Sequence, residues 1–312
     1  MVDITNPIFH DEAKAVAHLE ASRWPQGPFC PSCGSFNVHR MAGKTQAGMF
    51  LCNDCRGKFT ARVDSIMERS HIPVHKWLLA MHLMAASKKG MSSKQLQRML
   101  GVSYKSAWFL SMRIREAMKA DGNLAGPIGG EGKIIESDET FVGGKKKNVH
   151  RGKPEPKKHA VHALVERGGQ IRAKHVADVT AKTLKKNLKE LADRKSALHT
   201  DDSLANLSIG KSFADHQTVA HTLGEYVRGD AHTQTVESFF AVLKRGVFGS
   251  FHSISEQHLQ RYVDEFCFRW NNRQSLGVDD FARAAELLRA IEGKRLTYRP
   301  TDKGTQSSQA NA

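Results

Sequence analysis

The order of apolar segments between residues 133 and 271 constrains the fold more than any other feature of this sequence. A stretch rich in glycine with one proline, residues 122–132, marks a linker, and the periodicity of the chain changes beyond it. The expected elements are three strands, a helix, a fourth strand, a helical turn, a candidate fifth strand and two helices, at 133–141, 159–166, 170–179, 180–195, 196–200, 203–207, 215–227, 232–246 and 255–271. The fold class is therefore α/β with a mixed sheet.

Three acidic residues occupy particular settings in this order. Asp138 lies within the first strand, Asp201 follows the fourth strand at its end, and Glu237 lies near the start of a later helix. The order is that of ribonuclease-H-like α/β domains, in which neighbouring strands would bring the two aspartates together and the helix would deliver the glutamate. Hard oxygen ligands suit Mg²⁺ or Mn²⁺, and two such ions can activate an attacking oxygen and stabilise a leaving one. The sequence therefore predicts a two-metal carboxylate site for phosphodiester chemistry.

Other acidic residues compete with these three, since the chain has 32 of them and chance alone provides many triples. Alternation along a strand puts Glu136 on the same face as Asp138, whereas Glu139 faces the other way. Glu136 therefore remains an alternative ligand. Four further acidic residues are expected to be solvated or structural: Asp202, Asp230, Asp264 and Glu265.

Four of the five cysteines are paired as C-x2-C, with Cys30 and Cys33 separated by eighteen residues from Cys52 and Cys55. Two such pairs supply four thiolates for one tetrahedral Zn²⁺, and the ion provides folding energy that so short a segment cannot obtain from a core. Two redox motifs would each need a thioredoxin-like βαβ setting, which is absent. We expect a zinc ribbon, with iron as the less favoured metal, and a buried apolar role for Cys267.

A helix-turn-helix pattern follows the ribbon. Gly101 ends one short helix and Ser103 can cap a second, which would present Tyr104, Lys105 and Ser106 near its start. Base edges of DNA are read from that part of a recognition helix. A helical hairpin used only for packing can share the pattern, so this DNA contact is a hypothesis.

The charge balance favours a polyanionic partner, because 47 Lys and Arg exceed 32 Asp and Glu to give a formal charge of +15. Nucleic acid is the expected partner and a membrane is not, since the longest apolar stretch, residues 77–86, is far shorter than a span of about 20 residues. The amino terminus lacks a signal-peptide pattern, so we expect a cytoplasmic protein. Basic groups that could contact phosphates follow the first strand and Glu237, at Lys145, Lys146, Lys147, Lys244 and Arg245. Solvation is the alternative role for these side chains.

The chain divides into four expected parts. These are a zinc ribbon at 1–70, a helical DNA-binding segment and linker at 71–130, a ribonuclease-H-like catalytic domain at 131–280, and a tail at 281–312 that is expected to be helical at first and then polar and disordered.

Several runs resemble the DDE transposases of bacterial insertion sequences. They are residues 137–145, Thr200 with Asp201, residues 236–246, and a closing block between His252 and Arg273. Within these transposases, the chain resembles more specifically those of family 1595, whose members join an amino-terminal zinc ribbon to a ribonuclease-H-like catalytic domain. It covers roughly residues 15 to 275.

This resemblance implies that Asp138, Asp201 and Glu237 form the DDE triad and hold two Mg²⁺ or Mn²⁺, beside one structural Zn²⁺ in the ribbon. Water would attack the phosphodiester at a transposon end, and the freed 3′ hydroxyl would attack target DNA. The implied partners are double-stranded DNA, as inverted repeats and target, and further copies of the chain assembled on it, at the nucleoid when bound. Gln234 departs from the pattern, because family members tend to carry Asn three residues before the final acid, on the same helix face.

Two other readings stay open. A zinc-ribbon and helix-turn-helix regulator with an inactive ribonuclease-H-like domain explains the charge and the cysteines but leaves the DDE blocks unexplained. A nuclease that only hydrolyses would share the site without needing the two-part amino terminus.

Overall fold

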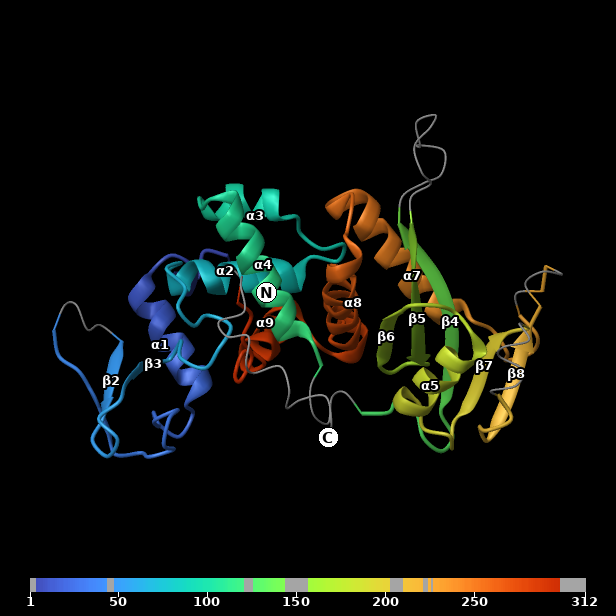
Figure 1. The fold of residues 1–312 in the computed structure, drawn as a ribbon, viewed down its shortest axis with the longest axis horizontal. Coiled ribbons are helices and arrows are strands. Elements are labelled where there is room, and N and C mark those ends of the chain that lie inside the picture. The colour runs from blue at the N-terminus through green and yellow to red at the C-terminus, as the bar shows by residue number, and fades with distance from the viewer. Residues whose placement is uncertain are drawn as a thin grey trace. The chain divides into compact units, whose positions relative to one another are not determined.

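The computed structural model describes residues 4–43, 48–120, 126–143, 157–202, 210–220, 224–225 and 227–297. The chain forms two compact units (Figure 1). The first comprises Met1–His82, Ser93–Ala117 and Ala285–Ala312, and the second comprises Leu83–Ser92 and Met118–Ala284.

The first unit begins with a short helix pair and a small antiparallel sheet of order β1-β2-β3. Its elements are η1 (Pro7–Phe9), α1 (Glu12–Arg23), β1 (Val38–Arg40), β2 (Met49–Cys52) and β3 (Lys58–Thr60). The Trp24 ring packs edge-on against Phe50 and Phe59, with centroids 5.4 and 5.9 Å away. These aromatic rings give the ribbon an apolar core in addition to its cysteines.

This unit also contains most of three helices, α2 (Val74–Ala86), α3 (Ser93–Leu100) and α4 (Tyr104–Met118). The end of α2, from Leu83, and the last residue of α4 belong to the second unit. The first of them starts on a carboxylate, because Glu12 accepts hydrogen bonds from the backbone N–H groups of Val74 and His75, at 2.8 and 3.0 Å. The predicted helix-turn-helix is present. Gly101 turns the chain with φ of 60°, and the Ser103 hydroxyl caps α4 by accepting from the N–H of Ser106 at 3.1 Å.

Residues near the carboxyl terminus also belong to the first unit. Arg23 is buried and donates to the carbonyls of Ala61 and Val63, while its other terminal nitrogen contacts Glu292 at 3.1 Å. The division into four parts predicted from the sequence stays a prediction.

The second unit is built on a five-stranded mixed sheet of order β6-β5-β4-β7-β8. The strands are β4 (Ile134–Gly143), β5 (Lys158–Glu166), β6 (Ile171–Val176), β7 (Ala197–Asp201) and β8 (Asp215–Val219). Pairing is antiparallel from β4 to β5 and β6, and parallel from β4 to β7 and β8. This is the predicted ribonuclease-H-like arrangement. The predicted fifth strand is shorter than expected, and the predicted turn at 203–207 lies outside the described residues.

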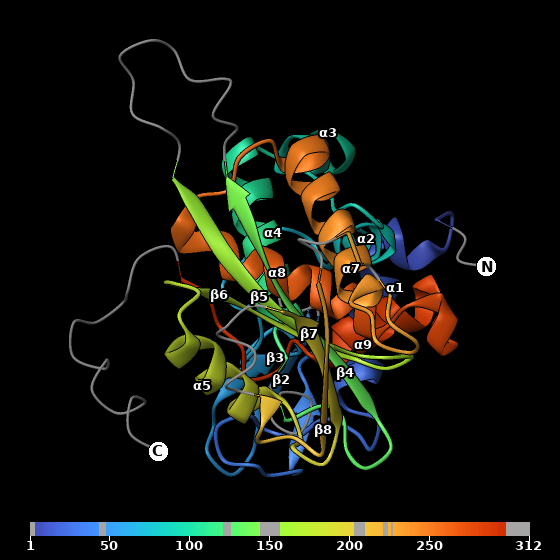
Figure 2. The same ribbon diagram turned by 90° about the vertical axis from the view of Figure 1, so that its right-hand side faces the viewer.

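Helices cover both faces of this sheet (Figure 2). On one face, α5 (Ala181–Leu191) packs Leu184 and Leu188 against Ile135 and Leu198 of the central strands. On the other, α7 (Gln234–Gly246) and α8 (Glu256–Asn271) pack on apolar residues of β5 and β6. Because side chains alternate along a strand, β4 sends Ile135 to the α5 face and Val142 to the α7 face.

Side chains of α8 satisfy the edge strand β6. Gln260 accepts from the N–H of His175 at 2.8 Å, and Asn271 accepts from the N–H of Ile171 at 2.7 Å. Covering an edge in this way blocks pairing with another chain. Beyond α7 the chain forms η6 (Val247–Phe251), and beyond α8 it forms η7 (Gln274–Leu276) and α9 (Asp280–Arg289).

Candidate active site and zinc centre

Asp138 and Asp201 occupy matching positions on neighbouring parallel strands. The ladder between β4 and β7 pairs Ile134 with Ala197 and Glu136 with His199, and each aspartate lies two residues beyond that last pair. Adjacent strands are about 4.8 Å apart, and residues two apart share a face. The two partly buried aspartates therefore lie at neighbouring positions on the α7 face of the sheet.

Glu136, the alternative ligand, has another role. Its carboxylate is fully buried and accepts from the N–H and hydroxyl of Thr235, both at 2.8 Å, and from the N–H of Val236 at 3.1 Å. A carboxylate at a helix amino terminus satisfies free N–H groups and interacts favourably with the helix dipole. Both Glu136 oxygens are thus used to fix the start of α7 against β4.

Arg167, in the turn between β5 and β6, completes this arrangement. Its Nε donates to Glu136 at 2.7 Å, and one terminal nitrogen donates to Nδ1 of His199 at 3.1 Å. The same side chain donates to the carbonyls of Asp230 and His232, which precede α7. Burial, and then the Arg167 charge, lower the pKa of His199, which keeps that ring neutral as an acceptor. Sequence reasoning missed Arg167, because a lone arginine in a turn carries no local signal of such contacts.

Glu237 is exposed in the first turn of α7, where its carboxylate accepts from the Thr233 hydroxyl at 3.0 Å. Gln234, the residue that departs from the family pattern, is exposed one helical turn earlier. Among the described residues, the Asp138, Asp201 and Glu237 carboxylates do not form a cluster with all ligand atoms within 4.8 Å. A two-metal site holds its ions about 3.5–4 Å apart, so its ligand atoms are spread over more space than those of a single ion.

The pKa of Glu139 is affected by the negative charge of the two neighbouring aspartates. Burial, and then the negative charges of Asp138 and Asp201, raise the pKa of its carboxyl to about 7. One of its oxygens, Oε1, is buried and has no hydrogen-bond partner among the described residues. The two aspartates therefore concentrate negative charge that a divalent cation would offset.

The four predicted zinc ligands meet in the first unit, with all four sulfur atoms within 4.8 Å of one another. The Sγ atoms of Cys30 and Cys55, and those of Cys33 and Cys52, lie 3.6 Å apart. A tetrahedral site with Zn–S bonds of about 2.3 Å needs sulfur atoms about 3.8 Å apart, so the cluster fits a zinc ion. Burial raises the pKa of the Cys30 thiol, but N–H groups of Cys33 and Ser32 and the neighbouring thiols outweigh it and bring the value to about 7.

Two family models match successive parts of this chain. Residues 127–271 match the family model described as the ISXO2-like transposase domain, and residues 10–58 match the transposase zinc-ribbon domain. This chain belongs to insertion-sequence transposase family 1595.

A relative of this transposase is an uncharacterized protein in transposable element ISH50 of Halobacterium salinarum. It is 29% identical over 280 residues, covering 84% of this chain and 91% of that protein. A solved Mos1 transposase paired-end complex with the left transposon end matches 62% of this chain and 76% of that chain, at 13% identity and a TM-score of 0.21. That score is too low to carry an argument, and the fold assignment depends on the sheet order and the family model.

The predicted DNA contacts of the transposase lie on both units. Tyr104 is 45% exposed at the start of α4, where Lys94 lies over its ring at 4.6 Å, and Lys105 is also exposed. Ser106 is partly buried. On α7, Lys244 is partly buried and Arg245 is exposed. The predicted contacts Lys145, Lys146 and Lys147 lie outside the described residues.

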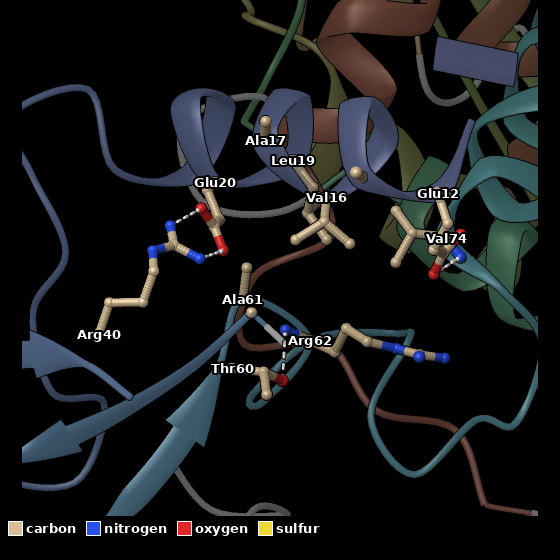
Figure 3. A pocket seen from close by; sticks show the side chains of 12 residues that line it. Glu12, Val16, Ala17, Leu19, Glu20, Arg40, Thr60, Ala61, Arg62 and Val74 are labelled. Carbon is tan, nitrogen blue, oxygen red and sulfur yellow. Dashed lines mark hydrogen bonds and ion pairs between the residues drawn. The ribbon is translucent and has the colours of Figure 1, made fainter. Parts of the chain in front are cut away.

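One cavity of the transposase, of about 620 Å³ in the first unit, holds none of the predicted site residues (Figure 3). Apolar side chains of α1, including Val16 and Leu19, line it, with the Glu20–Arg40 ion pair at one side. We assign no chemistry to this cavity. Among the described helices, none is both long and apolar enough to span a membrane.

Proposed function

We propose that this transposase cuts DNA at the ends of its element and joins the freed 3′ ends to target DNA, with Asp138, Asp201 and Glu237 as the ligands of two Mg²⁺ or Mn²⁺. One observation carries the proposal. The two aspartates lie at matching positions on β4 and β7. Glu136, two residues before Asp138 and on the same face of β4, holds the start of α7, the helix that carries Glu237.

The donor set fits divalent hard cations, because the three side chains offer only carboxylate oxygens. Bound ions would lower the pKa of the attacking water or hydroxyl and stabilise the leaving oxygen. The chain's own part is to hold the ligands still. Arg167 and Glu136 fix the start of α7, and the Thr233 hydroxyl orients the Glu237 carboxylate.

DNA would be bound by both units. The exposed start of α4, with Tyr104, Lys105 and Ser106, supports base recognition within the transposon ends. Lys244 and Arg245 on α7, and the basic residues Lys145, Lys146 and Lys147, would contact phosphates near the catalytic carboxylates. Because two transposon ends must be handled together, we propose that copies of the chain assemble as a homo-oligomer on DNA.

A strand-transfer assay tests this function. Duplex DNA carrying the element's inverted repeats is incubated with a target plasmid and the protein in Mg²⁺ or Mn²⁺, and joined products are counted. We expect joining by the wild type and at least a hundredfold loss in Asp138→Asn and Glu237→Gln, with DNA binding kept. Full activity in either variant would refute the assignment of that ligand. Specific DNA binding without joining by the wild type would instead support the regulator.

A further inference from the structure

The second unit contains a basic pocket lined mainly by residues of α7 and α8. Its volume is about 460 Å³, and five basic residues line it, Lys88, Arg245, Arg269, Arg273 and Arg283. Asp280 is the acidic residue among its described lining. None of the predicted catalytic carboxylates belongs to this pocket.

Its positive charge is only partly compensated. Arg269 pairs with Glu265, and Arg283 pairs with Asp280 at 2.6 Å. Among the described residues, no carboxylate pairs with Lys88, Arg245 or Arg273, and this leaves three cations facing one cavity. Nearby positive charges repel one another, so such a group is unfavourable without an anion.

Hydrogen-bond donors in the pocket wall also lack acceptors. The Arg269 side chain is only 7% exposed, yet its Nε and Nη2 have no hydrogen-bond partner among the described residues. The indole Nε1 of the adjacent Trp270 is likewise buried without an acceptor in that part of the chain. Buried donors are normally satisfied, so these unpaired N–H groups add to the positive potential of the pocket wall.

The guanidinium groups are held in place before any ligand binds. Arg269 stacks on Phe266 at 4.5 Å, and Arg273 stacks on Trp270 at 4.9 Å. Arg273 also donates to the carbonyls of Gly169 and Trp270, both at 2.9 Å. Fixed planar guanidinium groups suit two-point binding of phosphate oxygens.

The position of the pocket indicates where that phosphate comes from. Ser238, next to Glu237, and Arg245 line it from the same helix. Seven residues of α-helix span roughly 10 Å, which is about three nucleotides of B-DNA at 3.4 Å each along one strand. We propose that the pocket binds a backbone phosphate of the DNA strand that flanks the reacting phosphodiester. This inference rests on the proposed function, because the reacting phosphodiester defines which strand is bound.

The test measures binding of duplex DNA to the full-length protein at several salt concentrations, without divalent ions. Lys88→Ala combined with Arg245→Ala removes two exposed cations from the pocket. The matched control, Lys182→Ala combined with Lys185→Ala, removes two exposed cations from α5, on the other face of the sheet. Each phosphate contact contributes roughly 0.9 to the slope of log affinity against log salt. We expect the pocket variant to lower the magnitude of the slope by roughly 1 and the control to leave it unchanged.

Two additional measurements distinguish a DNA phosphate from free phosphate and control for misfolding. Arg269→Lys keeps the charge but lacks the planar fork, so we expect weaker DNA binding with an unchanged circular dichroism spectrum. Inorganic phosphate should raise the thermal midpoint of the wild type more than that of the Lys88/Arg245 variant. Equal salt slopes in the pocket and control variants would overturn the DNA proposal, and a phosphate effect that persists beside equal slopes would assign the pocket to free phosphate. This binding test does not measure strand transfer, so loss of catalysis and loss of this contact remain distinguishable.

Discussion

Glu136 on β4 accepts hydrogen bonds from both the backbone N–H and the hydroxyl of Thr235, in the first turn of α7. These bonds join segments 99 residues apart in the sequence. Asp138 follows Glu136 by two residues and Glu237 follows Thr235 by two, so one buried carboxylate sets the relative position of two of the proposed catalytic acids. The predictions below test this and related contacts.

Glu136→Gln should lower both stability and catalysis. The change removes a buried charge that pairs with Arg167 and leaves an amide nitrogen facing donors of α7. Leaving a buried charged group without its partner costs about 3–5 kcal/mol. Urea unfolding should show a loss of that order, and strand transfer should fall because Glu237 is displaced. Glu190→Gln, on an exposed ion pair with Lys174, is the control and should change stability by less than about 1 kcal/mol. Equal effects from both variants would contradict the anchoring role.

Gly246→Ala should destabilise the junction of α7 and α8. A Cβ at this position would lie 2.3 Å from Cζ of Phe266 and 2.6 Å from the carbonyl oxygen of Lys89. Such overpacking costs about 1–3 kcal/mol, measurable as a shift in the denaturant midpoint. Gly249→Ala provides a matched control, since a Cβ there meets nothing within 4 Å. If both variants unfold at the same midpoint, the close approach is not required.

His162 should make stability depend on pH. The ring is buried between Ser137 and Asn187, and burial lowers its pKa from 6.5 to about 4. Between pH 4 and 6.5, His162 is protonated in the unfolded chain but not in the folded chain. Its contribution to stability is therefore fully present above pH 6.5 and decreases as the pH falls toward 4. The loss amounts to about 3 kcal/mol, at 1.36 kcal/mol for each pKa unit.

Unfolding of His162→Gln between pH 4 and 7 isolates this contribution, because the other histidines and carboxylates titrate in both proteins. The stability difference between wild type and variant should change by about 2–3 kcal/mol across this interval. A difference that is constant with pH would show that folding does not lower the pKa of His162.

One zinc ion per chain should be found, held by Cys30, Cys33, Cys52 and Cys55. Chelation or Cys33→Ser should release it and unfold the ribbon, because metal binding supplies its folding energy. Metal analysis of the purified protein, with circular dichroism before and after chelation, measures both effects. Cys267→Ala, outside the cluster, should keep one zinc. Zinc loss without any change in the ribbon would argue against a structural ion.

Much of the second unit could be predicted from the sequence because its signals are local. Alternation within residues 134–143, and leucines at helical spacing in α5, determine element type and buried face without knowledge of distant contacts. In the first unit α1 was not predicted, although Asp11 caps it by accepting from the N–H of Lys14 at 3.0 Å and its sequence is rich in alanine. A cap followed by strong helix formers was the signal that could have revealed it.

The role of Glu136 could not be predicted in the same way. Strand alternation gave it the same face as Asp138, but its partners Arg167 and Thr235 are brought to it only by the folded sheet and α7. The basic pocket has the same origin. Its cations come from residues between Lys88 and Arg283, and the sequence singled out only Arg245 of these as a contact to DNA.

The central claim, that Asp201 is a catalytic ligand placed by β7, is tested most directly by comparing adjacent aspartates. Strand transfer by Asp201→Asn and by Asp202→Asn should be measured in the same Mn²⁺ assay, with DNA binding as the control for folding. The proposed site predicts at least a hundredfold loss of joining for Asp201→Asn, and less than a threefold change for Asp202→Asn, which lies beyond the strand end. Normal joining by Asp201→Asn, or loss only in Asp202→Asn, would contradict the assignment of the catalytic carboxylates.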